Sequence, residues 1–328
     1  MALFVPHAGC PHQCAFCNQK HIAGKSCSVT PDDVRAACKT ALATIPPATE
    51  TEIAFFGGSF TAIPRDEMIA LLKAAYPFVQ SGRVHGIRLS TRPDAVDDEV
   101  LSVLKTYGVT AIELGAQSMD DTVLNHVGRG HTAADVVCAS NRIRAHGFSL
   151  GLQMMTGLPA STVESDRETA RALAALKPDT MRVYPTLVLE HTPLAQRHHA
   201  GEYEPQTNEA AIEFGAWALR FFEREQGIRV IRMGLQDEPE LKDHWIAGPF
   251  MPAFREYCEN KLYLDQALAV LPPPDATEWK LMVHPSAVSK MIGQHRHNIE
   301  TLRRLGYRVT VAGDENTRKW EIRIEMGT

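Results

Sequence analysis

Three cysteines crowd into one short loop near the start of this 328-residue chain, and no other feature limits more strongly what the chain can fold into. Cys10, Cys14 and Cys17 are separated by three and by two residues. The whole chain has seven cysteines, an odd number that a secreted disulfide framework explains poorly. A metal site explains the spacing better, so we expect this loop to bind metal.

The spacing of the three thiolates favours an iron–sulfur cluster. Three sulfurs can bind three irons of a 4Fe–4S cubane, and the nearby fourth cysteine of a ferredoxin run is absent. The amine and carboxylate of S-adenosylmethionine (SAM) can chelate the open iron, and an electron entering the sulfonium then yields a 5′-deoxyadenosyl radical. A zinc knuckle is the alternative, with His12 or His21 as a fourth ligand.

Short apolar runs alternate with helical patterns through the first two-thirds of the chain, which is typical of βα units around a parallel sheet. Thr30 and Pro31 predict the start of one helix, and Ser161 with Glu164 predicts a capping box at the start of another. A doubly wound sheet would show the same alternation. Six units favour an α/β fold, a partial (βα)6 TIM-like barrel, with strands at Ala2–Val5, Glu52–Phe56, Gly86–Ser90, Ala111–Leu114, Ser149–Met154 and Thr180–Val183.

The remaining chain predicts a small second domain. We expect the barrel to occupy residues 1–240 and a helical extension with a Pro-rich linker to occupy 241–274. Residues 275–328 then read as β, α, α, β, β, an α+β domain. The net charge of −5 argues against a protein that coats nucleic acid indiscriminately. No apolar run approaches the ~20 residues of a membrane span, so we expect a cytoplasmic protein with no membrane partner.

Paired glycines and polar residues follow several predicted strands, where a barrel gathers its chemistry. Gly57 and Gly58 come after the second strand and let backbone approach a ligand closely. Gln117 ends the fourth strand region, Arg129 follows a short helix, and Gln153 ends the fifth strand. Turns also use glycine pairs, and a lone arginine is usually a surface residue. The prediction that these residues form a site therefore depends on their positions after the predicted strands.

The cysteine loop, with Phe16 before its last cysteine, resembles the radical SAM superfamily. The glycine pair and the polar residues match further motifs of that family. The resemblance implies that Cys10, Cys14 and Cys17 hold the cluster, that Gly57 and Gly58 contact the methionine amine of SAM, that Gln117 and Gln153 face its ribose, and that Arg129 faces its carboxylate.

The stretch from Phe4 to about Gln236 is similar to one branch of that superfamily, the radical SAM domain of the catalytic subunit of Elongator. Elongator modifies the wobble uridine of tRNA with SAM and acetyl-CoA, so the resemblance implies RNA modification, with tRNA favoured over ribosomal RNA. The family spaces its first cysteines more widely, and the chain after Asp275 is too short for an acetyltransferase domain. The matching phrases begin at Gly57, Thr91, Glu113, Gly128, Tyr184, Gly201 and Arg229.

The segment Met291–Ile299 resembles the Ile-Gly-x-x-Gly-x-x-Ile loop of KH domains, which clamps a nucleic-acid backbone. Arg296 stands where the second glycine is usual. The resemblance implies an RNA contact through Gly293, Arg296, Arg303 and Arg304. A solvated helix face on a capping domain is the alternative interpretation.

These observations favour a radical SAM enzyme that modifies an RNA base presented by the KH-like domain. Tyr184, at the end of the sixth strand, is the candidate catalytic side chain, although aromatic strand residues usually serve packing. The expected partners are RNA and an electron donor such as flavodoxin or ferredoxin. Two alternatives stay open: a radical SAM enzyme for a small metabolite or porphyrin precursor, and a non-catalytic RNA-binding adaptor.

Overall fold

The computed structural model describes residues 1–5, 12–18, 29–46, 50–235 and 239–327, with residues 239 and 240 described for their backbone alone. Cys10 and His21 lie outside the described residues. The chain forms two compact units. Unit 1 comprises Met1–Gln206 with Gln236–Pro249, and unit 2 comprises Thr207–Leu235 with Phe250–Thr328.

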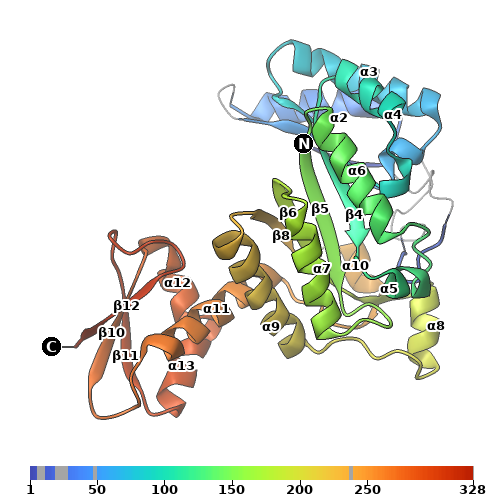
Figure 1. The fold of residues 1–328 in the computed structure, drawn as a ribbon. Helices are drawn as coiled ribbons and strands as arrows, with labels where there is room; N and C mark the ends of the chain where they lie inside the picture. Colours follow the sequence, from blue (N-terminus) through green and yellow to red (C-terminus); the bar gives the residue numbers. More distant parts are fainter. Residues whose placement is uncertain (6–11, 19–28, 47–49, 236–238, 328) are drawn as a thin grey trace. The chain divides into compact units, whose positions relative to one another are not determined.

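Unit 1 has a curled parallel sheet in which six strands pair in the order in which they occur along the chain (Figure 1). Alternate residues of these strands are apolar and fully buried, as Ile53 and Leu114 illustrate, because helices cover one face of the sheet. The fold is therefore the predicted α/β half-barrel. Its strands are β1 (Ala2–Val5), β2 (Glu52–Gly57), β3 (Gly86–Thr91), β4 (Val109–Gln117), β5 (Ser149–Thr156) and β6 (Thr180–Pro185).

Most helices of unit 1 begin at a residue whose side chain caps the first turn, whereas α3 (Arg65–Gln80) follows Pro64 without such a cap. Thr30 accepts from the backbone of Asp33 and forms the capping box before Pro31, as predicted. The capping box predicted at Ser161 and Glu164 lies one residue later in the structure. Thr162 is the N-cap, and the side chain of Ser165 accepts from the backbone of Thr162. The helices of unit 1 are α2 (Pro31–Thr44), α3 (Arg65–Gln80), α4 (Asp98–Thr106), α5 (Asp121–His126), α6 (Ala133–Ala145), α7 (Val163–Ala175), α8 (Pro193–His199) and α10 (Pro239–Asp243).

The carboxyl ends of the strands carry irregular backbone that aims side chains inward. The pairing of β4 with β5 shifts register between Gly115 and Gln117, and Gln117 adopts a left-handed φ of 67°. Such a bulge re-aims a side chain at the end of a strand. Beyond β6, two short strands pair antiparallel in unit 1, namely β7 (Val188–Leu189) and β9 (Trp245–Ala247).

Unit 2 contains the predicted β, α, α, β, β segment. Strand β10 pairs in parallel with β11 and antiparallel with β12. Helix α11 packs on this segment through Tyr263, whose ring stacks on Trp320 at a centroid distance of 5.6 Å. The elements of unit 2 are α9 (Asn208–Leu219), a π-helical turn (Arg220–Glu225), β8 (Arg229–Met233), α11 (Phe254–Val270), β10 (Glu278–Val283), α12 (Val288–Ile292), α13 (His297–Arg304), β11 (Arg308–Gly313) and β12 (Ile322–Met326).

Candidate active site

The cysteine loop follows β1 and is fixed at both sides by backbone hydrogen bonds. The amide of Cys17 donates to the carbonyl of Cys14 at 3.0 Å, which closes a turn. The amide of Ala15 donates to Val127 after α5, and its carbonyl accepts from Leu194 in α8, both at 2.9 Å. The described part of the loop is therefore held between α5 and α8.

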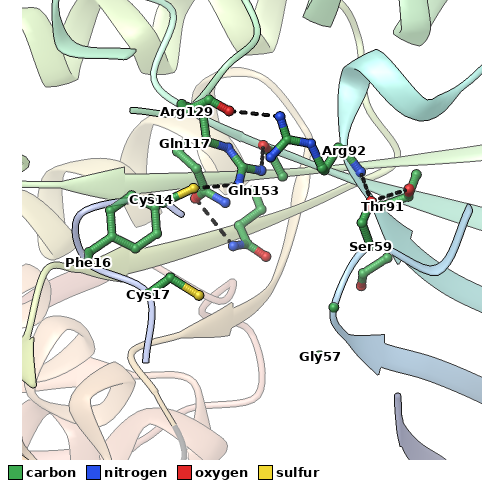
Figure 2. Close-up of a pocket in the computed structure, with 13 residues that line it drawn as sticks. Cys14, Phe16, Cys17, Gly57, Ser59, Thr91, Arg92, Gln117, Arg129 and Gln153 are labelled. Atoms are coloured by element: carbon green, nitrogen blue, oxygen red, sulfur yellow. Dashed lines mark hydrogen bonds between the residues drawn. The ribbon is translucent and has the colours of Figure 1, made fainter. Parts of the chain in front are cut away.

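Arg129 lies directly against this loop. Its Nη1 donates to the sulfur of Cys14 at 3.4 Å, and its Nη2 donates to the carbonyl of Gly115 at 2.6 Å (Figure 2). Its side chain is buried, and its Nε atom has no hydrogen-bond partner among the described residues. A buried donor without a partner is costly, so the geometry leaves one guanidinium position for a ligand.

Two glycines make room for Arg129 and the cysteine loop. A Cβ at Gly115 would lie 2.8 Å from Nη2 of Arg129, closer than real side chains come. A Cβ at Gly130 would lie 2.3 Å from the ring of His12, and Gly130 has a left-handed φ of 75°. The left-handed φ therefore favours glycine at position 130, whereas a side chain at position 115 would displace the guanidinium of Arg129.

The opposite wall of the pocket is built by the ends of β2 and β3. Gly57 has a φ of 111°, and a Cβ there would lie 2.9 Å from the carbonyl of Val5, so only glycine fits. The hydroxyl of Ser59 lies 2.9 Å from that of Thr91 and accepts from the amide of Arg92 at 3.0 Å. Figure 2 shows Gly57 and Ser59 facing Cys14 and Arg129 across the pocket.

Gln117 and Gln153 come from neighbouring strands and meet at the pocket. The Nε2 of Gln153 donates to the Oε1 of Gln117 at 3.3 Å. The left-handed backbone of Gln117 turns its amide toward the cysteine loop, as Figure 2 shows. The pair leaves amide donors and acceptors at the carboxyl end of the sheet, where a polar ligand can be hydrogen-bonded.

One pocket brings most of the predicted site together. Its lining includes Cys14, Cys17, the Gly57-Gly58 pair, Gln117, Arg129 and Gln153. Thiol sulfurs, an arginine with an unused buried donor and a backbone wall without side chains suit a thiolate-bound cluster next to a zwitterionic ligand. The predicted ligand Cys10 lies outside the described residues, so the arrangement is seen for two of the three sulfurs.

Tyr184 has a different environment from the other predicted residues. It is half-buried and is absent from the lining of the described pocket. Its hydroxyl accepts from Nη1 of Arg182 at 3.3 Å, and Arg182 also forms a two-pronged ion pair with the buried carboxylate of Glu113.

Gly151 on β5 leaves room for the side chain of Glu113. A Cβ at Gly151 would lie 2.7 Å from the Cγ of Glu113, so a larger residue would displace the carboxylate.

Sequence reasoning missed several pocket residues at the end of β3. Ser90, Thr91 and Arg92 line the pocket, and Arg92 is 2% exposed. Arg92 holds Asp94 through two hydrogen bonds of 2.8 and 3.0 Å and donates to the carbonyl of Arg129 at 2.8 Å. The signal was present, because Arg92 follows the third predicted strand, Gly86–Ser90, after a single residue.

His131 is buried behind Arg129. Its Nε2 lies 3.2 Å from the carbonyl of Ala116, and its Nδ1 has no partner in the described part of the chain. Burial, reinforced by the nearby charge of Arg129, lowers the pKa of His131 from 6.5 to about 4. The ring is therefore neutral at physiological pH and adds no second positive charge beside the guanidinium.

Family comparison agrees with this geometry. Residues 4–173 match the model of the radical SAM superfamily, and residues 178–263 match that of the Radical_SAM C-terminal domain. The chain belongs to the radical SAM superfamily. The cofactors of this superfamily are a 4Fe–4S cluster and SAM.

Curated relatives lie in the Elongator branch of the superfamily. The tRNA uridine(34) acetyltransferase of Methanocaldococcus jannaschii is 32% identical over 133 residues, which are 40% of this chain and 25% of that protein. Elongator complex protein 3 of Homo sapiens is 30% identical over 190 residues, 52% of this chain and 35% of that protein. The chain thus spans about a third or less of the length of these two relatives.

Solved structures of radical SAM proteins share the fold. Archaeal Methanocaldococcus infernus Elp3, with its N-terminus deleted, superposes with a TM-score of 0.62 at 22% identity and covers 71% of this chain and 58% of its own. Streptococcus suis SuiB bound to S-adenosylmethionine gives a TM-score of 0.55 at 11% identity and covers 74% and 54%. Within the described residues, no helix combines the length and apolar character needed to cross a membrane.

Proposed function

We propose that this radical SAM protein modifies a base in RNA, with the wobble uridine of tRNA as the favoured target. The observation that carries the proposal is one pocket in which Arg129 links the sulfur of Cys14 to the carbonyl of Gly115, and which the glutamine pair of β4 and β5 also lines. The support for RNA comes from relatives that are tRNA uridine(34) acetyltransferases.

The residues of the pocket have separable tasks in this proposal. Cys14 and Cys17, with Cys10, hold the cluster, which when bound supplies the electron that cleaves SAM. Arg129 offers its unused Nε–H to the carboxylate of SAM, and Gly57 exposes backbone to the amine. Gln117 and Gln153 bind the ribose. Flavodoxin or ferredoxin is the proposed electron donor, and Tyr184 contacts the substrate from β6.

The proposed RNA contact lies in unit 2, at the turn between α12 and α13. Gly293 has a φ of 77°, and a Cβ there would lie 3.0 Å from the amide of Asn298, so the turn requires glycine. Arg296 is exposed and adopts a left-handed φ of 64°, the conformation a glycine would take at this position. Arg303 and Arg304 are exposed in the last turn of α13. Three arginines with free access to solvent suit phosphate contacts.

Turnover of SAM tests the enzymatic half of the proposal. The anaerobically reconstituted protein is reduced with dithionite, and 5′-deoxyadenosine is quantified. We expect it from the wild type and its loss, with loss of the cluster absorbance, in Cys14→Ala. Cys138→Ala is the matched control, because Cys138 is exposed on α6 and outside the pocket. A wild type that binds a cluster but forms no 5′-deoxyadenosine contradicts the enzyme and favours the adaptor interpretation.

Nucleoside analysis tests the RNA half. Total tRNA and ribosomal RNA from wild-type and deleted cells are digested, and the modified nucleosides are compared by mass. We expect one modified uridine to be missing from tRNA of the deleted strain and to return with the wild-type gene but not with Cys14→Ala. Identical nucleoside profiles, with active SAM cleavage, would move the substrate to a small metabolite.

A further inference from the structure

The antiparallel pair of β7 and β9 places two side chains of metal-binding type directly opposite each other. Leu189 pairs with Trp245, and the amide of Glu190 donates to the carbonyl of His244 at 2.8 Å, which continues the ladder by one position. Residues opposed in an antiparallel pair project their side chains to the same face of the sheet. The Nδ1 of His244 accordingly lies 3.3 Å from Oε2 of Glu190.

His191 adds a third group through an unusual backbone conformation. It has a φ of 61°, in the left-handed region that few residues other than glycine adopt, with asparagine, aspartate and histidine the commonest exceptions. The conformation is held by Thr192, which caps α8: its hydroxyl donates to the carbonyl of Leu189 at 2.7 Å and accepts from the amide of Ala195 at 3.0 Å. The resulting turn brings Nε2 of His191 to 3.8 Å from Oε2 of Glu190.

The three groups match the coordination chemistry of zinc. One ligand atom from each of Glu190, His191 and His244 lies within 4.8 Å of the other two. In a tetrahedral zinc site with bonds of about 2.0–2.1 Å, neighbouring ligand atoms lie about 3.3 Å apart. The observed separations of 3.3 and 3.8 Å from the carboxylate oxygen to the two imidazole nitrogens are close to that spacing.

We propose that Glu190, His191 and His244 form a surface site for a divalent transition-metal ion, with Zn²⁺ as the favoured occupant. Two imidazoles and one carboxylate form the donor set that zinc takes in proteins, and they leave one coordination position open. The side chains are 49%, 56% and 27% exposed, respectively, so the ion enters directly from solvent. The site is separate from the cysteine loop and does not depend on the proposed RNA substrate.

The site also lies on the segment that supports the cysteine loop. Residues 190 and 191 immediately precede α8, whose Leu194 donates to Ala15 of that loop at 2.9 Å. Phe16 of the loop packs on Val188 and Leu194. An ion bound by His244 on one side and His191 on the other ties β9 to the start of α8. Metal binding therefore stiffens the wall on which the loop rests.

Metal content of the cluster-loaded protein tests the site. Anaerobically reconstituted wild-type protein, with its cysteines occupied by iron, is incubated with one to two equivalents of ZnCl₂ and desalted, and zinc and iron are measured per chain. We expect one zinc per chain and a raised midpoint of thermal unfolding. Combined His191→Ala and His244→Ala should weaken zinc binding at least tenfold and leave iron unchanged.

Two further variants keep the result interpretable. Combined His85→Ala and His199→Ala removes two exposed histidines elsewhere in unit 1 and should retain zinc as the wild type does. Glu190→Gln keeps the side-chain shape and should also weaken zinc binding. It therefore tests the site even where the double variant His191→Ala and His244→Ala does not fold. Absence of zinc from the wild type, or equal zinc in the Glu190→Gln and control proteins, overturns the site. Neither measurement involves SAM turnover, so failure here is distinct from failure of the proposed function.

Discussion

Nη1 of Arg129 lies 3.4 Å from Sγ of Cys14, and the same guanidinium is fixed by the carbonyl of Gly115. In the proposed cluster site, a positive donor beside the thiolate of Cys14 lessens the negative charge that the site must hold. The Nε–H of the same side chain has no hydrogen-bond partner among the described residues and is the group proposed to bind an anionic ligand. One arginine thus connects the metal site and the proposed SAM site.

Replacement of Arg129 by lysine should impair SAM cleavage while leaving the fold intact. Lysine keeps the charge but has a single nitrogen, which cannot reach Gly115, Cys14 and a ligand together. We expect kcat/KM for 5′-deoxyadenosine formation to fall roughly 10–100-fold, the usual effect of losing a partner of a metal ligand. Arg171→Lys, on the exposed face of α7, is the control. Unchanged kcat/KM in Arg129→Lys, with normal iron content, would contradict the assignment.

Gly151→Ala should destabilise the barrel through its neighbour on β4. The new methyl group would lie 2.7 Å from the Cγ of Glu113 and displace the carboxylate from Arg182. Overpacking of this kind costs about 1–3 kcal/mol of unfolding free energy. In a Glu113→Ala background the Cγ contact is gone and only the hydroxyl of Thr180, 2.9 Å from the new methyl group, still has to shift, so the same substitution should cost less than in the wild type. Equal costs in both backgrounds, measured by urea unfolding, would refute the steric explanation.

Stability should depend on pH through His131. Its pKa is about 4 in the folded chain and near 6.5 when unfolded, so the unfolded chain binds more protons between these values. The folded chain is therefore most stable above pH 6.5 as far as this group is concerned, and it loses free energy of unfolding as the pH falls toward 4. The loss at pH 5 is about 2 kcal/mol. The measurement is the difference in unfolding free energy between wild type and His131→Gln at pH 7 and pH 5.

Asp166, a buried carboxylic acid, is the reason for comparing the wild type with His131→Gln rather than measuring the wild type alone. Burial raises the pKa of Asp166 to about 6, which works in the opposite direction between pH 4 and 6. Asp166 is present in both proteins, so its contribution cancels when they are compared. A gap between wild type and His131→Gln that stays constant from pH 7 to pH 5 would show that His131 does not titrate as described.

Arg296→Gly should separate stability from RNA binding in unit 2. Glycine accepts the left-handed φ of 64° without strain, so the free energy of unfolding should stay level or rise by up to about 1 kcal/mol. Loss of the cationic side chain should weaken RNA binding and reduce its salt dependence by about one counterion. Arg318→Ala, exposed in the turn after β11, controls for charge alone. RNA affinity equal to that of the wild type would remove Arg296 from the interface.

Local patterns were sufficient for most of the fold. Apolar runs predicted all six barrel strands, and Thr30 with Pro31 predicted the start of α2, because these signals act within a few residues. The error at Ser161 arose because two adjacent residues can both cap a helix, and packing selected Thr162. The expected domain limits at 240 and 275 stay predictions.

Contacts between residues far apart along the chain could not be predicted from local sequence patterns. The motifs placed Gln117, Arg129 and Gln153 at one pocket, but nothing local indicated that Arg129 contacts Cys14. The ion pair of Glu113 with Arg182 likewise depends on a register between β4, β5 and β6 that no single segment encodes. Pairing of β7 with β9 joins residues more than fifty positions apart, which hid the histidine site.

The hydrogen bond between Leu194 and Ala15 has a consequence for biosynthesis. The cysteine loop emerges from the ribosome well before α8 (Pro193–His199), the helix that fixes it. Until then the loop cannot hold its final shape. Iron loading during translation would therefore meet an unsupported loop, and the cell gains by delivering the cluster only after α8 has folded.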